Sequence, residues 1–427
     1  SRAMRIAVIG TGVAGLVAAH HLRREHELTL FEAGAHVGGH VHTHAIEVAG
    51  RAYTVDTGFI VFNRKTYPTF CRLLEELGVE AQDSDMGFSV RCERTGLEWN
   101  GRNLDTLFAQ RSNLLRPSFL AMVRDILRFN KEALELLADR EGRWSLGEWL
   151  AHKRYSKSFI QNYAVPMGAA IWSAGEGDMH AFPARFFVDF FHNHGMLQVD
   201  GRPQWLTVKG GSKSYVEALI KPLKERIHTR TPVQRVRRFD DRVELTLPGG
   251  EVRSFDQVVI ATHSDQALRL LADPSTPERE ILGAIRYQEN EAALHTDARL
   301  LPRLRKCWAS WNYHLVKPEE PLQPGPVAVT YWMNKLQALD CPEQICVTLN
   351  RTHAVAPEKL IKRITYHHPQ YTRESIAAQA RRDEISGVRR TWYCGAYWTY
   401  GFHEDGAKSG AVVAERIAKA PLEALAR

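Results

Sequence analysis

The chain has 427 residues, of which 44% are hydrophobic and 25% charged, and its formal net charge at pH 7 is +7. A chain of this length can build two domains with a large core, and the composition is ordinary for a soluble protein. No apolar stretch approaches the ~20 residues that cross a bilayer, and no basic run indicates nucleic-acid binding. The positive charge leaves transient contact with an anionic membrane surface open.

The six cysteines are scattered along the chain. No two of them have the spacing of a zinc site or a redox motif, so we expect reduced thiols. Reduced thiols are typical of the cytoplasm. We therefore predict a cytoplasmic protein, peripheral at most to the inner face of the membrane.

The first forty residues have the pattern of a nucleotide-binding βαβ unit. An apolar run leads into Gly10-Thr11-Gly12-Val13-Ala14-Gly15, a helix of small residues follows, and Glu32 closes a second apolar run. Gly10 permits a tight turn, Gly12 lets a pyrophosphate approach the backbone, and Gly15 lets the helix pack on the strand. Glu32 follows at close to the ~20 residues expected for a carboxylate that binds a ribose hydroxyl. A glycine-rich loop without a ligand is the disfavoured alternative.

The segment after Glu32 distinguishes a flavin from a nicotinamide. The run Glu32-Ala33-Gly34-Ala35-His36-Val37-Gly38-Gly39-His40 resembles the E-x-x-x-R-x-G-G-R signature of the flavin amine oxidase superfamily. In that superfamily the paired glycines let the chain pass close to the flavin diphosphate. Here His36 and His40 stand at both arginine positions and offer less permanent charge. The resemblance implies FAD as the cofactor.

The same resemblance implies the fold. We expect an α/β protein in which a Rossmann-like FAD-binding domain of the glutathione-reductase type is interleaved with an α+β substrate domain, as in amine oxidases. The FAD-binding domain is predicted over residues 1–83, 201–265 and 386–427. The substrate or cap domain is predicted over residues 84–200 and 266–385.

Local patterns predict several elements. Residues 64–78 indicate a helix that ends at Gly78, and residues 88–92 and 97–99 indicate a hairpin. Strands near residues 307–313, 327–332 and 345–349 are expected to form an antiparallel sheet under a substrate cavity. The small residues of segment 162–173 suit either the cavity wall or tight helix packing.

A further helix is predicted from Pro117 toward Asp139, with apolar residues at helical spacing and Arg124, Arg128 and Lys131 interleaved. One interpretation is a lid helix that contacts lipid through apolar and basic residues. The interpretation that we favour is a helix packed on the core with a solvated basic face.

Three later segments resemble flavin contacts of the superfamily. The segment from Asp56 to Ile60 is similar to one that runs beside the flavin ring, although an edge strand with an ordinary turn would look alike. Val233 is expected to present its backbone to adenine, and the strand that ends at Thr262 to support the diphosphate. A simple β-meander would leave a similar pattern.

The C-terminal segment 392–410 is similar to the superfamily's G-E … G-[FY]-x-E-G-A motif, in which a helix N-terminus points at the flavin pyrimidine. The resemblance implies that Phe402 faces the ring and that the His403 amide approaches it, while Ala396 replaces the usual glutamate. The predicted cofactor-binding residues are Gly10, Gly12, Val13, Ala14, Gly15, Glu32, Ala33, Gly38, Gly39, His40, Thr57, Gly58, Phe59, Val233, Thr262, Gly395, Gly401, Phe402 and His403.

The candidate catalytic residues are His295 and Phe402. Amine oxidases commonly keep a lysine in the segment that matches residues 287–297, and this chain has none there. His295 and Asp297 would share one face of a strand and form an acid/base pair, although a hydrogen-bonded structural histidine is the favoured alternative.

His40, His42 and His44 alternate and would project to one side of a strand, as three metal ligands can. The flavin motif already accounts for this segment. We therefore expect no metal.

Along its full length the chain resembles one branch of the superfamily, bacterial NAD/FAD-binding flavoproteins similar to the N-terminal flavin region of plant cyclopropane fatty-acid synthases. The resemblance is carried by residues 37–40, 56–63, 294–297 and 310–313. It implies two-electron oxidation or desaturation of a fatty-acyl chain on a membrane lipid. The alternatives are an amine or polyamine oxidase and a non-catalytic flavoprotein that supports a lipid methyltransferase partner.

Overall fold

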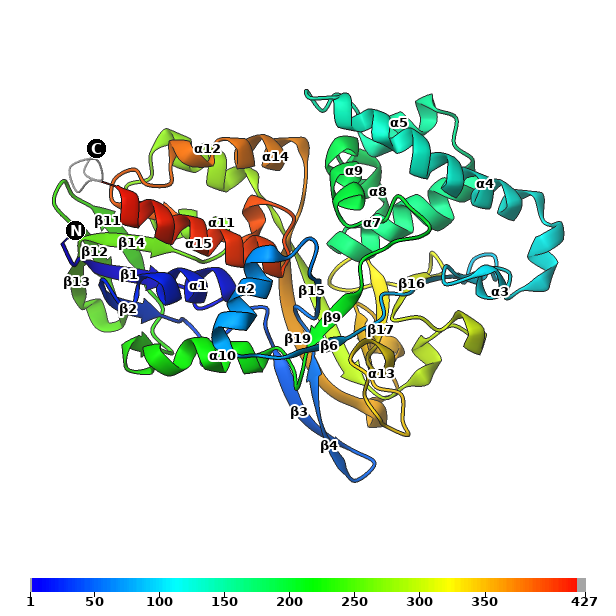
Figure 1. The fold of residues 1–427 in the computed structure, drawn as a ribbon, viewed down its shortest axis with the longest axis horizontal. Coiled ribbons are helices and arrows are strands. Elements are labelled where there is room, and N and C mark those ends of the chain that lie inside the picture. The colour runs from blue at the N-terminus through cyan, green and yellow to red at the C-terminus, as the bar shows by residue number, and fades with distance from the viewer. Residues whose placement is uncertain (1, 421–427) are drawn as a thin grey trace.

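The computed structural model describes residues 2–420, and these residues form two parts that lie side by side (Figure 1). Residues 1 and 421–427, which the predicted FAD-binding domain includes, lie outside the described residues. No helix within residues 2–420 is both long and apolar enough to cross a membrane.

The first part is built on a five-stranded parallel sheet. Its strands, in spatial order, are β10 (Ile227–His228), β2 (Glu27–Phe31), β1 (Arg5–Ile9), β14 (Gln257–Ile260) and β20 (Thr391–Tyr393). The apolar run of β1 is buried because helices cover one face of the sheet and a β-meander covers the other. The strands come from three separated stretches of the chain, and the α/β fold class is confirmed.

Two helices pack closely on one face of this sheet. These are α1 (Val13–Leu22) and α15 (His403–Lys419), which lie together in Figure 1. A Cβ on Gly410 would lie 2.3 Å from the Ala14 carbonyl oxygen, so only glycine allows this approach. The meander on the other face consists of β11 (Arg235–Arg238), β12 (Val243–Thr246) and β13 (Val252–Phe255), and helices α11 (Ser264–Leu270), α12 (Thr276–Ala284) and α14 (Arg373–Ala380) complete this side.

The second part contains a seven-stranded sheet. Its order is β19 (Leu360–Pro369), β15 (Tyr287–His295), β18 (Cys346–Leu349), β17 (Ala328–Trp332), β16 (Trp311–Leu315), β7 (Phe88–Cys92) and β8 (Glu98–Asn100). All neighbours are antiparallel except β16 and β7. The predicted hairpin over residues 88–99 is thus confirmed, as is the predicted antiparallel pairing of the three strands near residues 307–313, 327–332 and 345–349.

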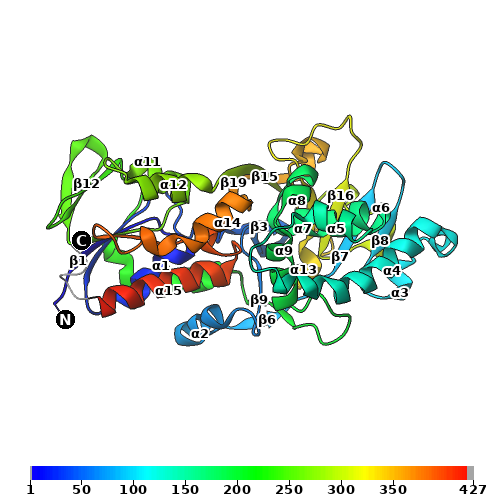
Figure 2. The ribbon, with the colours of Figure 1, turned by 90° about the horizontal axis from the view of Figure 1, so that it is seen from above.

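A group of helices covers this sheet at the end farthest from β1 (Figure 2). They are α3 (Leu104–Leu107), α4 (Pro117–Glu132), α5 (Leu146–His152), α6 (Lys157–Phe159), α7 (Val165–Trp172), α8 (Glu176–Ala181) and α9 (Ala184–Asn193). The predicted helix beyond Pro117 ends as an α-helix at Glu132 and continues as a 3₁₀ turn over Ala133–Ala138. A Cβ on Gly168 would lie 2.1 Å from the Met179 methyl group, so the small residues of segment 162–173 serve tight packing.

Shorter elements complete the fold. They are the hairpin of β3 (Thr43–Val48) and β4 (Arg51–Asp56), the sheet of β5 (Val61–Asn63), β9 (Trp205–Val208) and β6 (Ala81–Asp83), and the helices α2 (Pro68–Leu77), α10 (Lys213–Ile220) and α13 (Met333–Leu336). Helix α2 begins at Pro68, later than predicted, because proline fits the first helical turn. It ends as predicted at Gly78, whose φ of 67° is left-handed.

Candidate cofactor site

A cavity of about 530 Å³ lies at the carboxyl edge of the parallel sheet. Residues directly after β1, β2, β14 and β20 line it, because the carboxyl ends of parallel strands meet at one edge. These residues are Gly10, Glu32, Ala261 and Gly395. The start of helix α1 lines the same cavity.

The first glycine turn forms the floor of this cavity. Gly10 has a φ of 102°, and a Cβ there would lie 2.7 Å from the Ala261 oxygen. A Cβ on Gly15 would lie 2.2 Å from the Gly10 oxygen, so Gly15 lets helix α1 pack on the turn. Gly12 precedes the helix, and Gly12, Val13 and Ala14 line the cavity. The unpaired amides of a helix start attract an anion such as a diphosphate.

The paired glycines pack against this turn. Gly39 has a φ of 60°, and a Cβ there would lie 2.9 Å from the Gly12 Cα. The Gly38 amide donates to the Thr11 carbonyl oxygen over 2.9 Å. The two glycine motifs therefore form a single backbone surface, and a side chain at Gly39 would separate them.

Glu32 stands at one end of the cavity. Its Oε1 accepts a hydrogen bond from the Thr11 hydroxyl over 2.6 Å, and its Oε2 accepts one from the Gly34 amide over 2.8 Å. These bonds orient a carboxylate toward the position that a ribose occupies in dinucleotide sites. Thr11 was not among the predicted residues, although its place between the first two glycines was a signal.

His40 lies on the cavity wall among other aromatic rings. Its ring centroid is 5.6 Å from that of His263, 5.6 Å from that of His368 and 5.4 Å from that of Tyr366. The surrounding protein lowers the pKa of His40 well below its ordinary value and that of His368 to about 4. His40, which stands at an arginine position of the superfamily signature, is therefore a neutral imidazole packed beside two further histidines.

The expectation that His40, His42 and His44 project to one side is wrong for His40, whereas the rings of His42 and His44 do lie together. Strand β3 begins only at Thr43, and His40 lies in the turn before it and faces the cavity. His42 packs instead between His36, at 4.3 Å, and His44, at 4.1 Å between ring centroids. In the part of the chain that the structure describes, no cluster of His, Cys, Asp or Glu side chains is arranged to hold a metal ion.

Most of the predicted cofactor-binding residues line the cavity. They are Gly10, Gly12, Val13, Ala14, Glu32, Ala33, Gly39, His40, Phe59, Val233, Thr262, Gly395 and Gly401. The residues that do not line it are Gly15, Gly38, Thr57, Gly58, Phe402 and His403.

Several of these other residues support the wall. A Cβ on Gly58 would lie 1.5 Å from the His40 oxygen, so Gly58 allows the His40 turn to form. The Thr57 hydroxyl contacts His44 Nε2 at 2.9 Å and the Tyr366 hydroxyl at 2.8 Å. Gly58 and Thr57 therefore affect the cavity indirectly, because they position His40 and Tyr366, respectively.

Helix α15 begins beside the cavity, which Gly401 and Gly406 line. The Asp405 carboxylate accepts a hydrogen bond from the Phe402 amide over 2.9 Å, and burial raises the pKa of Asp405 to about 7. The His403 ring is buried between Phe59 and Phe70, with centroids 4.7 Å from each. Phe402 stacks on Phe190 at 5.2 Å, at the border of the helical part.

His295 does not form the predicted side-chain pair with Asp297. Its Nδ1 accepts a hydrogen bond from the Asp297 backbone amide over 2.9 Å, which leaves Nε2 to donate to the Thr348 hydroxyl over 2.7 Å. The Asp297 carboxylate binds Arg299 over 2.7 Å. His295 is fully buried, does not line the cavity, and has a pKa lowered to about 4 by burial. The contacts are those of a structural histidine.

Several cavity residues that the sequence analysis did not predict lie on the wall opposite the glycine turns. His263, Gln266 and Arg269 follow strand β14, and their position soon after Thr262 could have indicated them. Tyr287 and His368 come from the second part of the molecule. No local pattern marks these two, because only the pairing of β15 with β19 brings them to this edge.

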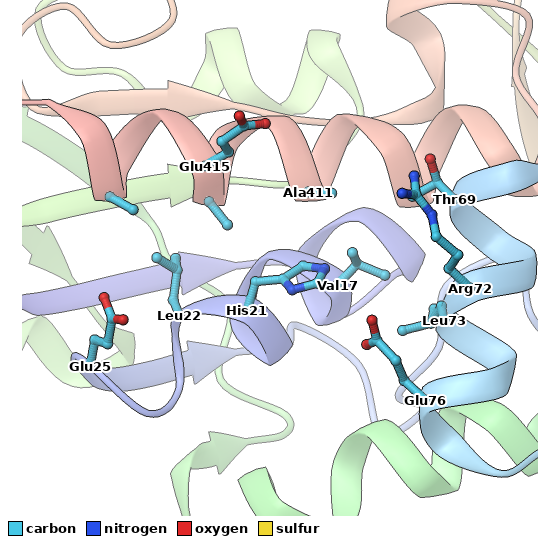
Figure 3. A pocket seen from close by; sticks show the side chains of 12 residues that line it. Val17, His21, Leu22, Glu25, Thr69, Arg72, Leu73, Glu76, Ala411 and Glu415 are labelled. Atoms are coloured by element: carbon cyan, nitrogen blue, oxygen red, sulfur yellow. The ribbon is translucent and has the colours of Figure 1, made fainter.

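A second cavity, of about 370 Å³, lies between α1, α2 and α15 (Figure 3). Its wall mixes His21 and Arg72 with Glu25, Glu76 and Glu415. The amides of Thr69 and Phe70, at the start of α2, already bind the Glu404 carboxylate. These amides are not free for an anion, so the cavity at the glycine turn is the better nucleotide site.

Comparison with known proteins gives consistent matches. Residues 13–296 match the family of flavin containing amine oxidoreductases. The chain is 26% identical over 287 residues to AofH of Mycobacterium tuberculosis, named for a flavin-containing monoamine oxidase, with 64% of this chain and 60% of that protein covered. It is 25% identical over 330 residues to the flavin-dependent L-tryptophan oxidase RebO of Lentzea aerocolonigenes, with 66% and 63% covered. The chain thus spans less than two thirds of the length of these relatives.

Solved structures share the whole fold. Putrescine oxidase bound to putrescine has a TM-score of 0.68 at 15% identity and covers 97% of this chain and 99% of its own. A CLA-producing fatty acid isomerase from P. acnes has a TM-score of 0.67 at 18% identity and covers 98% and 99%. At such identities the likeness shows the fold alone.

Proposed function

We propose that this chain, which belongs to the flavin-containing amine oxidoreductase family and is an FAD-dependent oxidoreductase, oxidises the fatty-acyl chain of a membrane lipid. FAD, when bound, would supply a two-electron oxidant: one carbon of the acyl chain would give up a hydride and its neighbour a proton, which would pass to bulk solvent. An electron acceptor such as dioxygen would then take up the two electrons. The product is an unsaturated acyl chain.

The residues of the cavity fit FAD. Gly10 and Gly39 each stand where a Cβ would collide with backbone, so the wall is bare backbone of the kind that a diphosphate approaches. The start of α1 offers unpaired amides to the phosphates, and Glu32 is oriented toward a ribose. The start of α15 lies at the same cavity and is suited to negative charge on the flavin pyrimidine.

The observation that carries the proposal is an aromatic wall beside Gly401. Phe186, Phe190, Tyr371, Tyr400 and Phe402 form this wall, with ring centroids between 4.9 and 5.4 Å for the pairs Phe186–Tyr400 and Phe190–Tyr400. Tyr400 and Phe402 flank Gly401, which lines the cofactor cavity. An acyl chain that leaves the cavity at Gly401 would therefore meet aromatic rings.

The charges around the cavity argue against a cationic amine. Among the described residues that line it, Glu32 is the only carboxylate, and it stands at the ribose end. His40, His263 and His368 are neutral because their surroundings lower their pKa values. A protonated amine would find no counter-charge here. The shared fold of the fatty acid isomerase from P. acnes is compatible with an acyl substrate.

The chain's own residues position the reaction. The aromatic wall holds the acyl chain and excludes water from the ring side of the cavity. The hydroxyl of Tyr371 lies 2.6 Å from the place of a Cβ on Gly401, so a side chain at position 401 would close this edge. Gly401 thus allows Tyr371 to pack against the chain at the border of the cavity.

The test is the visible spectrum of the purified holoprotein under anaerobic conditions, before and after addition of a bacterial phospholipid extract. Bleaching of the oxidised flavin band by lipid, with none by putrescine or spermidine, is the expected result. Bleaching by polyamines alone would indicate an amine oxidase instead. A flavin that neither addition reduces would indicate a flavoprotein that supports a lipid methyltransferase without turnover.

A matched pair of variants tests the aromatic wall. Tyr400→Ala removes a ring beside Gly401, and we expect slower reduction by lipid with an unchanged spectrum of the oxidised flavin. Phe239→Ala removes a half-buried ring next to Arg242 on the meander side and serves as the control. Equal rates in the two variants would remove the wall from the proposal.

A further inference from the structure

Exposed leucines gather in one stretch of the helical part. Large hydrophobic side chains that are well exposed among the described residues include Leu104, Leu114, Leu115, Leu120, Leu127 and Leu134, all within residues 104–134. Leu115 is 88% exposed and Leu127 58%. Single exposed leucines are normal on a protein surface, whereas a group of them marks an interaction site.

The spacing on α4 places leucines and basic residues on one line. Arg116, Leu120, Arg124, Leu127, Lys131 and Leu134 follow one another at steps of three or four residues, and all six are exposed. Residues so spaced share one face of a helix, here with Arg116 at the N-cap of α4 and Leu134 in the 3₁₀ turn that continues it. The line alternates a basic side chain with a leucine, and we call these six residues the basic leucine stripe.

The opposite face of α4 packs in the core. Phe119, Met122 and Phe129 are at most 1% exposed and belong to the core of the helical part. The favoured interpretation of this helix, packing on the core, is thus right for its inner face. The outer face differs from a solvated basic face, because every second position along the stripe is a leucine.

Neighbouring carboxylates neutralise only part of the stripe. Arg124 of the stripe contacts Oδ1 of the buried Asp125 at 3.4 Å, and Asp125 also contacts Arg128 and accepts a hydrogen bond from the Ser156 amide over 2.7 Å. Glu132 contacts Arg128, which lies off the stripe, and Glu135 pairs with Lys153 over 2.7 Å. Within the described residues, Arg116 and Lys131 have no ion-pair partner.

We propose that the basic leucine stripe docks the protein on an anionic phospholipid bilayer. In such a contact the leucines enter the headgroup boundary, and the arginines and lysine bind lipid phosphates with their aliphatic stems along the surface. Charge decides between occupants: a second copy of the stripe would bring guanidinium groups against one another, whereas anionic headgroups complement them.

Helix α4, which carries the stripe, lies at the end of the molecule opposite to β1 in both views (Figures 1 and 2). The inference stands apart from the proposed substrate. An enzyme that oxidises a water-soluble compound would dock by the same stripe, and a lipid oxidase would gain access to its substrate by it.

The experiment is co-sedimentation of the FAD-loaded full chain with vesicles. Vesicles of phosphatidylglycerol and phosphatidylethanolamine are expected to bind it, vesicles of pure phosphatidylcholine to bind it weakly, and salt to release it. Each basic residue near an anionic surface contributes about fivefold to partitioning, so Arg116→Gln/Arg124→Gln/Lys131→Gln should lower it by roughly a hundredfold. Leu120→Gln/Leu127→Gln should lower it by at least about tenfold, because half-exposed leucines bury further on docking.

Matched controls change the same side-chain types elsewhere. Lys221→Gln/Lys224→Gln/Arg237→Gln removes three exposed basic residues from the first part, and Val252→Gln/Ile361→Gln removes two exposed apolar side chains. Both controls should sediment as the unaltered protein does. Thermal unfolding and the flavin spectrum of every variant show that it is folded.

Three results would overturn the proposal. One is no sedimentation with anionic vesicles, and another is equal loss of binding in the stripe variants and their controls. The third is a concentration-dependent dimer that the leucine variants abolish, which would make a second copy the occupant. Flavin reduction by detergent-dispersed lipid does not need docking, so its failure would count against the proposed substrate and not against the stripe.

Discussion

Replacement of Gly12 by alanine should separate cofactor binding from folding. Gly12 lines the cofactor cavity, and its φ of −72° is open to any residue. A Cβ there would have a single backbone neighbour within 4 Å, the Gly39 Cα at 3.9 Å. The methyl group therefore meets no protein atom closely and enters the space above the start of α1. We expect Gly12→Ala to fold normally.

The loss of affinity follows from the amides that the methyl group covers. If the new methyl group keeps a diphosphate from two backbone amides at the start of α1, two charge-assisted hydrogen bonds of about 1.5 kcal/mol each are lost. The total of about 3 kcal/mol corresponds to a Kd for FAD that is roughly 150-fold higher. The effect on the free energy of unfolding of the apoprotein should stay within about 1 kcal/mol, as for alanine at other helix starts.

The assay is titration of the apoprotein with FAD, followed by flavin fluorescence, alongside chemical denaturation without cofactor. Gly177→Ala is the matched control, because a Cβ on this α8 glycine has no neighbour within 4 Å and Gly177 lies outside the cavity. Its Kd should equal that of the unaltered protein. The reasoning is refuted if Gly12→Ala binds FAD as the control does, or if its apoprotein loses several kcal/mol of stability.

Three further changes have defined outcomes. Gly15→Ala places a Cβ 2.2 Å from the Gly10 oxygen, so denaturation of the apoprotein should show a loss of about 3 kcal/mol or more, and unaltered stability would contradict the close packing of α1. His295→Ala removes two buried hydrogen bonds and should lower the free energy of unfolding by about 2 to 4 kcal/mol. The rate of flavin reduction per folded enzyme, measured by stopped flow, should stay unchanged. A large fall in that rate would restore His295 as a catalytic residue. Burial raises the pKa of Asp405 to about 7 in the folded state, whereas its unfolded pKa is about 4. Between these two values the folded state binds one proton more than the unfolded state. The free energy of unfolding of the apoprotein should therefore fall over this range as the pH rises, by up to about 4 kcal/mol. Asp405→Asn should flatten that slope in denaturation series at successive pH values, and an unchanged slope would assign it to another group.

The local chemistry of the glycine turns was readable from the sequence. Gly10 and Gly39 take left-handed conformations, and Glu32 follows its strand at the expected distance. These features depend on neighbours in the chain, so residue type and spacing suffice to predict them. The α/β class, the hairpin over residues 88–99 and the end of α2 at Gly78 were predictable for the same reason.

The wall of the cavity opposite the glycine turns depended on tertiary structure. His368 reaches His40 because β19 pairs with β15, and His295 loses its expected partner because Thr348 on β18 and the Asp297 amide take its two nitrogens. Register between distant strands decides such contacts, and register follows from the packing of whole faces.

The helix beginning at Pro117 shows the same division within one element. Its apolar spacing predicted an amphipathic helix, but Phe119 and Leu120 both fit that spacing. Only the packed structure shows that Phe119 is buried while Leu120 is exposed. A sequence thus determines that a helix has apolar positions, whereas the orientation of the helix on its neighbours decides which of them the core covers and which remain free to bind.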